Sequence, residues 1–367
     1  TMSSVSIKRG QFVINGQRRP YRTYSSFCLM SLYQNERHDD ARRWLDRLQS
    51  MGMDGPRLFG ETWPLDSTSV FFGNPEWTPV ARIVDEHQPP NSGLRLLPQY
   101  PKWVERLTED LEQRDMIAEF CVIATLKNWE GVGHVLNRAA QMFASMFAPE
   151  DCPYIFETIN EADAYAGNLT PGEVALQGYR WHRTAPPSEP DHTNFPGSLI
   201  GVSGGGNYAP PWDDSGYTHR NLHLPRGKNW MLGENHMPIK EWLPLAQAKA
   251  GKRPLALNET VHYIDKSEWA SWMKLAPKWA GLSTSNAIDV YEYMEDVLEA
   301  GVSFCVHTRT GMSTNYAEDL TALERILVAH AGSAIGTSPT PPGPPSVPTP
   351  EKRGFWESLV EFLGRIW

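Results

Sequence analysis

The chain has 367 residues, 40% of them hydrophobic and 21% charged, which is enough for one barrel-sized domain or two ordinary ones. Its formal net charge of −9 and the lack of a long Lys/Arg-rich run argue against a nucleic-acid-binding protein. No apolar stretch reaches about 18 residues, so we expect no transmembrane segment.

A short hairpin is predicted at residues 5–15. Val5-Ser6-Ile7 and Phe12-Val13-Ile14 are strand-like, and Asn15-Gly16 is a strong signal for a tight turn. We expect this hairpin to precede the main fold.

Strand-like and helical segments then alternate along the chain. The expected strands are residues 21–28, 55–59, 116–125, 154–159, 198–202, 217–224, 254–257 and 301–307. The expected helices are residues 39–50, 102–114, 134–147, 171–181, 239–250, 287–300 and 319–330. This alternation implies parallel strands, so the sequence predicts an α/β fold, a (β/α)8 TIM barrel. A Trp- and Pro-rich segment at 60–98 interrupts it, and loops of this length inside a domain are usually functional or disordered.

The composition changes after residue 332. Residues 336–350 are mostly Pro, Thr, Ser and Gly and predict an extended linker between a barrel at 1–335 and the end of the chain. Residues 351–367 predict a short amphipathic C-terminal helix. We expect this helix to dock on its own barrel or on a protein partner. A lipid surface is less favoured, because the polar face carries few Lys and Arg residues.

Four cysteines are spread along the chain: Cys28, Cys121, Cys152 and Cys305. They show no paired spacing and no CxxC motif, so the sequence predicts buried free thiols rather than a disulfide framework or a zinc site. We expect neither a metal nor a cofactor.

Two of the predicted strands end in the same dipeptide. Asn160-Glu161 follows the strand at 154–159, and Asn258-Glu259 follows the strand at 254–257. As the fourth and seventh strands of a barrel, these would deliver both glutamates to the carboxyl-end rim, where TIM-barrel enzymes have their active sites. Cleavage of a glycosidic bond needs one protonated carboxylic acid and one carboxylate. A lone loop glutamate is usually a solvated surface charge, but this repeated pattern favours catalysis.

These motifs resemble those of the clan A glycoside hydrolases, which are retaining (β/α)8 enzymes that include cellulases, mannanases and β-galactosidases. The resemblance spans residues 5–332 and includes the lead-in at 10–16 and the segment at 45–59, which ends near Arg57. It implies that Glu161 is the acid/base and Glu259 the nucleophile. It also implies that Asn160 contacts the sugar 2-hydroxyl and that Arg57 supports the nucleophile, which makes physical sense because a nearby cation keeps a carboxylate ionised.

The chain also departs from the pattern of that family. Ala162 follows the acid where proline is common, and His307 stands where strand eight usually offers a tryptophan. The family often has a His-x-Tyr pair on strand six, for which Tyr217-Thr218-His219 is a reversed approximation, so His219 and His307 are candidate substrate-binding residues. Tryptophans on predicted loops after strands are candidates for sugar stacking: Trp63, Trp129, Trp212 and Trp230.

The leading hypothesis is therefore a retaining β-glycoside hydrolase that cleaves a poly- or oligosaccharide. The alternative is a non-catalytic carbohydrate-binding or structural barrel that is tethered by its Pro-rich segment to a larger assembly, such as a viral particle or a cell-surface complex. We expect a secreted, extracellular or virion-associated protein of microbial or viral origin rather than a cytoplasmic one.

Overall fold

The structure is a computed structural model. It describes residues 3–60, 97–123, 132–148, 151–160, 174, 194–196, 199–205, 216–223, 239–275, 283–312 and 319–331. The linker predicted at 336–350 and the helix predicted at 351–367 lie outside these residues and stay predictions. All but one residue of the helix predicted at 171–181 also lies outside them.

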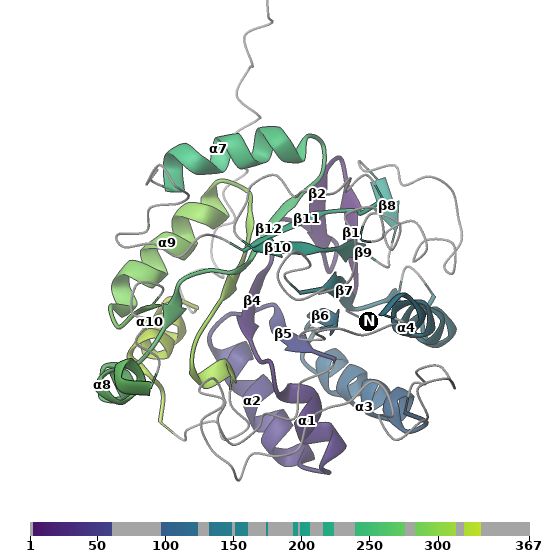
Figure 1. The fold of residues 1–367 in the computed structure, drawn as a ribbon, viewed down its shortest axis with the longest axis horizontal. Helices are drawn as coiled ribbons and strands as arrows, with labels where there is room; N and C mark the ends of the chain where they lie inside the picture. The colour runs from purple at the N-terminus through teal and green to yellow at the C-terminus, as the bar shows by residue number, and fades with distance from the viewer. Residues whose placement is uncertain are drawn as a thin grey trace, which may run out of the picture. The chain divides into compact units, whose positions relative to one another are not determined.

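Parallel strands form a nearly closed barrel at the centre of the fold (Figure 1). In chain order they are β4 (Arg22–Ser25), β5 (Gly55–Phe59), β6 (Ala118–Ile123), β7 (Tyr154–Ile159), β9 (Leu199–Gly201), β10 (Ser203–Gly205), β11 (Arg220–His223), β12 (Leu255–Glu259) and β15 (Ser303–Val306). β9 and β10 are two halves of the fifth strand position, since β9 pairs with β7 and β10 pairs with β11. β15 returns to pair with β4. The predicted α/β TIM barrel is confirmed.

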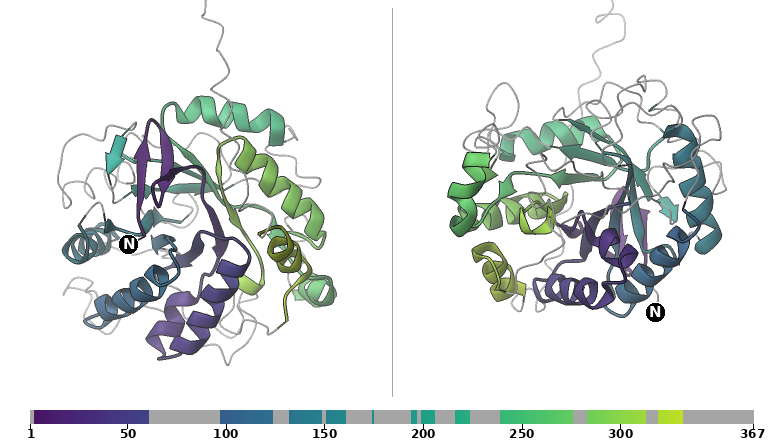
Figure 2. Two further views of the ribbon diagram at one scale, coloured as in Figure 1. Left: turned by 180° about the vertical axis from the view of Figure 1, so that it is seen from behind. Right: turned by 60° about the horizontal axis from the view of Figure 1, so that its bottom comes forward.

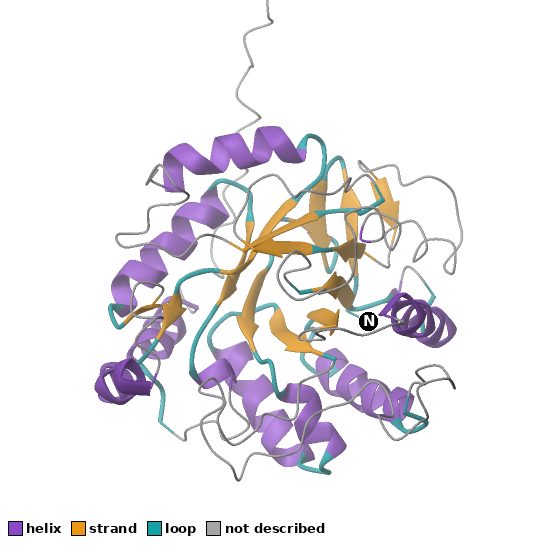
Figure 3. Ribbon diagram, in the orientation of Figure 1, coloured by secondary structure: helices purple, strands orange, loops and turns teal. Residues whose placement is uncertain are grey.

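Helices lie outside the strands (Figure 3). They are α1 (Leu29–Gln34), α2 (His38–Ser50), α3 (Tyr100–Glu112), α4 (Val132–Met146), α7 (Ile239–Ala250), α8 (Lys266–Leu275), α9 (Ala287–Glu299) and α10 (Ala322–Ala331). The sequence did not predict α1 or α8. In α1 the first five residues are all buried, so the segment has no amphipathic pattern to detect. Among the described residues, none of the helices is long and apolar enough to cross a membrane.

The N-terminal hairpin closes the amino end of the barrel. β1 (Val5–Lys8) and β2 (Gln11–Ile14) pair in antiparallel fashion, and β3 (Gln17–Arg18) and β8 (Asn194–Pro196) extend them to a four-stranded sheet (Figure 2). The apolar hairpin side chains form one buried cluster with residues at the amino ends of the barrel strands: Val5, Ile7, Phe12, Ile14, Tyr21, Ile117, Ile155, Leu199 and Ala256. The carboxyl ends of the strands are thereby left for a functional site.

Two further features complete the barrel. The larger apolar core fills the space between strands and helices, and all four cysteines are buried without disulfides, as predicted. Near the carboxyl ends, β13 (His262–Tyr263) pairs with β14 (Ser283–Thr284), and the short 3-10 helix η4 (Thr310–Met312) packs on β4.

The contact between η4 and β4 gives a test of the fold. A Cβ at Gly311 would lie 1.7 Å from the backbone oxygen of Ser25, an atom that cannot move without displacing β4. We expect Gly311→Ala to lower the free energy of unfolding by about 3 kcal/mol, measured by urea denaturation. At Gly301 a Cβ would meet nothing within 4 Å, and φ is +77°. Gly301→Ala should therefore cost only about 1 kcal/mol. Equal losses would contradict the close contact.

Candidate active site

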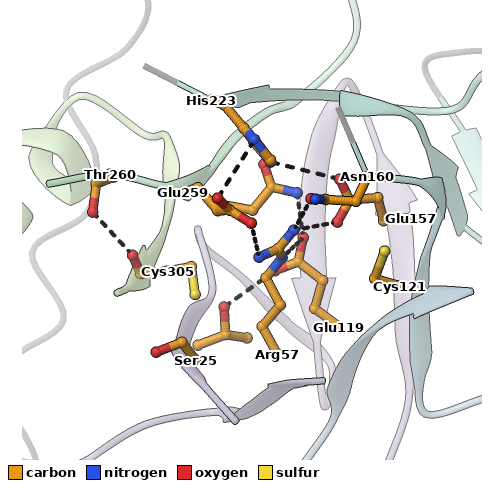
Figure 4. A network of polar contacts seen from close by, with 12 residues as sticks. Ser25, Arg57, Glu119, Cys121, Glu157, Asn160, His223, Glu259, Thr260 and Cys305 are labelled. Carbon is orange, nitrogen blue, oxygen red and sulfur yellow. Dashed lines mark hydrogen bonds and ion pairs between the residues drawn. The ribbon is translucent and has the colours of Figure 1, made fainter. Parts of the chain in front are cut away.

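The guanidinium of Arg57 lies at the centre of a buried polar cluster inside the barrel (Figure 4). Its Nη1 donates to Glu259 Oε1 at 2.9 Å, and its Nη2 donates to Glu157 Oε2 at 2.6 Å and to Asn160 Oδ1 at 3.0 Å. One buried cation on β5 therefore joins the carboxyl ends of β7 and β12, which are not neighbours in the barrel.

Arg57 stays protonated in this cluster. Burial works to lower its pKa, but the nearby carboxylates of Glu157, Glu259 and Glu119 outweigh burial and raise the pKa well above its ordinary value. The guanidinium also lies 5.3 Å from the ring centroids of both Phe27 and Phe59, which stack on each other with centroids 4.0 Å apart. One ring in the turn after β4 and one at the end of β5 thus add a cation–π attraction to the ion pairs.

His223 at the end of β11 lies between two of the carboxylates. Its Nδ1 is 3.7 Å from Glu259 Oε2, and its Nε2 is 3.7 Å from Glu157 Oε1. Figure 4 shows the ring beside these carboxylates. Burial works to raise the pKa of Glu157, but Arg57 and then His223 counter it and leave the pKa below its ordinary value. Glu157 is therefore an ionised partner of the cation.

Glu119, the second residue of β6, is a third buried carboxyl group beside Arg57. Its Oε1 lies 3.8 Å from Arg57 Nε and accepts a hydrogen bond of 2.7 Å from Asn258 Nδ2. With all groups ionised, Arg57 would face three carboxylates, and each buried ion costs several kcal/mol in lost hydration. Burial raises the pKa of Glu119 to about 7, against the opposing effect of Arg57. Glu119 is thus a carboxyl group of the cluster that can hold a proton near neutral pH.

The two candidate sugar-binding histidines lie at opposite ends of the barrel. His307 follows β15 at the carboxyl end, where its ring lies 5.4 Å from Phe27 and 4.7 Å from His262. His219 precedes β11 at the amino end, and its ring packs edge-on against Phe12 of the hairpin at 5.5 Å. Burial lowers the pKa of His219 to about 3, so it is a neutral packing residue. The prediction that His219 binds sugar is inconsistent with this position.

His223 is the strand-six histidine that stands beside Glu259. The segment at 217–224 does form a strand, but its pairing starts at Arg220 opposite Leu255 and places His223 opposite Glu259. The predicted residue, His219, and the observed one, His223, are four residues apart, which is about 13 Å along a strand. That distance moves a side chain from one end of the barrel to the other.

The structure describes some of the other predicted site residues and not the rest. The structure brings together Arg57, Asn160 and Glu259. Glu161, the next residue after Asn160, lies outside the described residues, and so do the four loop tryptophans: Trp63, Trp129, Trp212 and Trp230.

Sequence reasoning missed Glu119, Glu157 and His223. A signal for the glutamates was present, because each interrupts an otherwise apolar strand, and a charged residue in a buried strand needs a partner. Within the described residues, no group of three or more His, Cys, Asp and Glu side chains could hold a metal ion.

No protein-family model matches the chain, and no curated protein matches it. Solved structures do. A candidate glycoside hydrolase from Bacteroides vulgatus matches 93% of this chain with a TM-score of 0.64 at 11% identity, and the chain spans 62% of that protein's length. The β-mannanase from the blue mussel Mytilus edulis matches 90% of this chain and 97% of its own, with a TM-score of 0.52 at 11% identity.

A third solved structure is GH5_18 from Streptomyces cattleya in complex with GlcNAc. It matches 88% of this chain and 82% of its own, with a TM-score of 0.52 at 14% identity. The chain has the fold of these proteins. At such identities the likeness establishes the (β/α)8 barrel, and the chemistry has to be argued from the site.

The raised pKa of Glu119 predicts how stability depends on pH. The carboxyl group has an ordinary value of 4.5 and a folded value of about 7, so the folded chain binds a proton that the unfolded chain releases between these values. Stability is therefore lost as pH rises from about 4.5 to about 7, by about 3 kcal/mol for this one group. Glu119→Gln should remove this part of the slope, measured by urea denaturation at a series of pH values.

A matched control is Glu324→Gln. Glu324 is equally buried but lies on α10, where it accepts from Tyr24 Oη and pairs with Arg47. This variant should keep the wild-type loss of stability between pH 4.5 and pH 7, because Glu119 is intact. A Glu119→Gln variant with the wild-type slope would show that another group takes up the proton.

Proposed function

We propose that this chain is a retaining β-glycoside hydrolase, with Glu259 as the nucleophile and Glu161 as the acid/base. The observation that carries the proposal is the ion pair of Arg57 with Glu259 at the carboxyl end of β12. A nucleophilic carboxylate must be ionised, and a buried guanidinium at 2.9 Å favours the charged form.

The position of Glu259 also fits the reaction. Its side chain is about 9% exposed, so it is almost dry yet reachable from the carboxyl end of the barrel, where TIM-barrel active sites lie. Asn160 at the end of β7 is fixed by the same guanidinium, and the next residue along the chain is Glu161. The proposed acid and nucleophile thus come from strand ends that share one cation.

The proposed reaction has two displacements. Glu259 attacks the anomeric carbon while Glu161 gives its proton to the glycosidic oxygen, so that the bond to the leaving sugar breaks and a glycosyl ester forms on Glu259. Glu161 then takes a proton from water, the water oxygen attacks the anomeric carbon, and the ester bond breaks. Both carboxyl groups return to their starting states, and the product keeps its β configuration.

For the substrate we propose a β-linked poly- or oligosaccharide, with a β-1,4-mannan as the first to test. β-Mannanases are among the structural neighbours, including those of Mytilus edulis and the sea hare Aplysia kurodai.

The nucleophile can be tested with Glu259→Gln. We expect release of reducing ends from mannans, β-glucans, galactans or chitin-like glycans by the wild-type chain, with retained configuration by proton NMR. The variant should lose at least about 10⁴-fold in kcat, because the first bond cannot form. Glu324→Gln should keep the wild-type rate. Binding without turnover by the wild type would favour a carbohydrate-binding barrel, and equal turnover by Glu259→Gln would exclude this nucleophile.

The acid/base can be tested with Glu161→Ala on two kinds of substrate. Turnover of the polysaccharide should fall steeply because the leaving sugar oxygen is not protonated. An aryl β-glycoside with an acidic phenol needs no such proton, so it should still glycosylate Glu259 and leave the ester trapped, visible as added mass on the intact protein. Equal losses on both substrates, with no added mass, would remove Glu161 from this role.

A further inference from the structure

β12 contains a bulge beside the proposed nucleophile. Leu257 pairs with Leu222 of β11, but the next pair joins Glu259 to His223, so Asn258 is an extra residue on β12. A bulge of this kind turns a side chain away from the regular alternation of a strand. It explains why Asn258 and Glu259, although adjacent, both reach groups inside the barrel: Glu119 and Arg57.

The bulge is held from across the barrel by Glu119. Asn258 Nδ2 donates to Glu119 Oε1 at 2.7 Å, and both side chains are buried. The other oxygen of Glu119 accepts from Thr23 Oγ1 at 3.2 Å, which fixes the carboxyl group to β4. β6 and β12 are separated by three other strands in the sheet order. This contact therefore ties the end of β12 to the opposite wall.

Glu119 also faces the cation that holds the nucleophile. Its Oε1 lies 3.8 Å from Arg57 Nε, while Arg57 Nη1 bonds to Glu259. One carboxyl group thus contacts both the residue before Glu259 and the partner of Glu259. The titratable and charged groups that interact with Glu119 lie on β15, β5, β6 and β7 and just before β4: Tyr21, Arg57, Cys121, Glu157 and Cys305.

We propose that Glu119 is a positioning residue, which receives the Asn258 amide and so fixes the bulge that aims Glu259 at the anomeric carbon. This role rests on the proposed function of the site. A nucleophile is effective only when its oxygen is held in line with the reacting atom, and a displacement of about 1 Å costs up to 100-fold in rate. Glu119 has no contact with substrate in this role.

The test compares two substitutions of the same residue. Glu119→Gln keeps an oxygen that accepts the Asn258 amide, whereas Glu119→Ala removes it. We expect Glu119→Ala to lower kcat by about 10- to 100-fold with little change in KM. The position of the Glu259 carboxylate relative to the anomeric carbon affects the transition state and not substrate binding. Glu119→Gln should restore most of kcat. Glu324→Ala, at a buried glutamate on the outer α10, should lower thermal stability and leave kcat unchanged.

Asn258→Ala tests the same hydrogen bond from its donor side. If Glu119 acts through Asn258, then Asn258→Ala should lower kcat as Glu119→Ala does, and the double variant should be no worse than either single one. Rates are measured well below each melting temperature, per mole of folded protein. If Glu119→Ala does not fold, Asn258→Ala decides alone, and a wild-type kcat for it overturns the role.

The outcomes separate this role from the proposed function. An active wild type whose kcat is unchanged by Glu119→Ala, or whose two single losses multiply in the double variant, overturns the positioning role and leaves the hydrolase in place. A wild type that turns over no glycan in the panel overturns the proposed function, and the positioning role with it.

Discussion

The burial of Arg57 among carboxylates is the constraint on which the rest of the site depends. A buried guanidinium is tolerable only where its donors meet acceptors, and here Nη1 and Nη2 donate to Glu259, Glu157 and Asn160. The planar fork presents two nitrogens to two different strand ends at once, which a lysine could not do. The geometry of the carboxyl end therefore follows from one side chain whose charge cannot be removed.

The excess of negative groups around this cation has a chemical consequence. Three buried carboxyl groups cannot all stay ionised beside one guanidinium at low free-energy cost. The protein separates them by environment. Glu157, close to Arg57 and His223, has a lowered pKa, while Glu119 has a raised one. A proton taken up at Glu119 lessens the competition for Arg57, which favours the pair with Glu259.

The amino end and the carboxyl end of the barrel differ in the side chains that line them. At the amino end the hairpin residues Val5, Ile7 and Phe12 cover an apolar floor, which is ordinary core chemistry. The interior above it is lined with polar groups that need one another. Along β12, the apolar residue Ala256 belongs to this floor, and the bulge at Asn258 lies next to the polar group of Glu259. Irregular pairing beside a functional group is common in strands that aim side chains.

The amino-acid sequence by itself determined the order of strands and helices. Alternating apolar segments are local, so the strand at 154–159 and the helix at 239–250 match the structure to the residue. The repeated Asn-Glu dipeptides are also visible in the sequence, because each comes at the end of a predicted strand. Arg57 can be found as a charged residue inside a short buried strand. The helix α1 escaped prediction, since a segment buried on all sides has no periodicity.

Only the tertiary structure decided which buried side chains meet. Whether His219 or His223 stands beside Glu259 depends on the register between β11 and β12, which neighbouring strands set and the local sequence does not. Likewise, Glu119 and Asn258 are 139 residues apart and come together only when the barrel closes. The sequence could place charges inside strands, but the contacts that set their protonation arise from closure of the sheet.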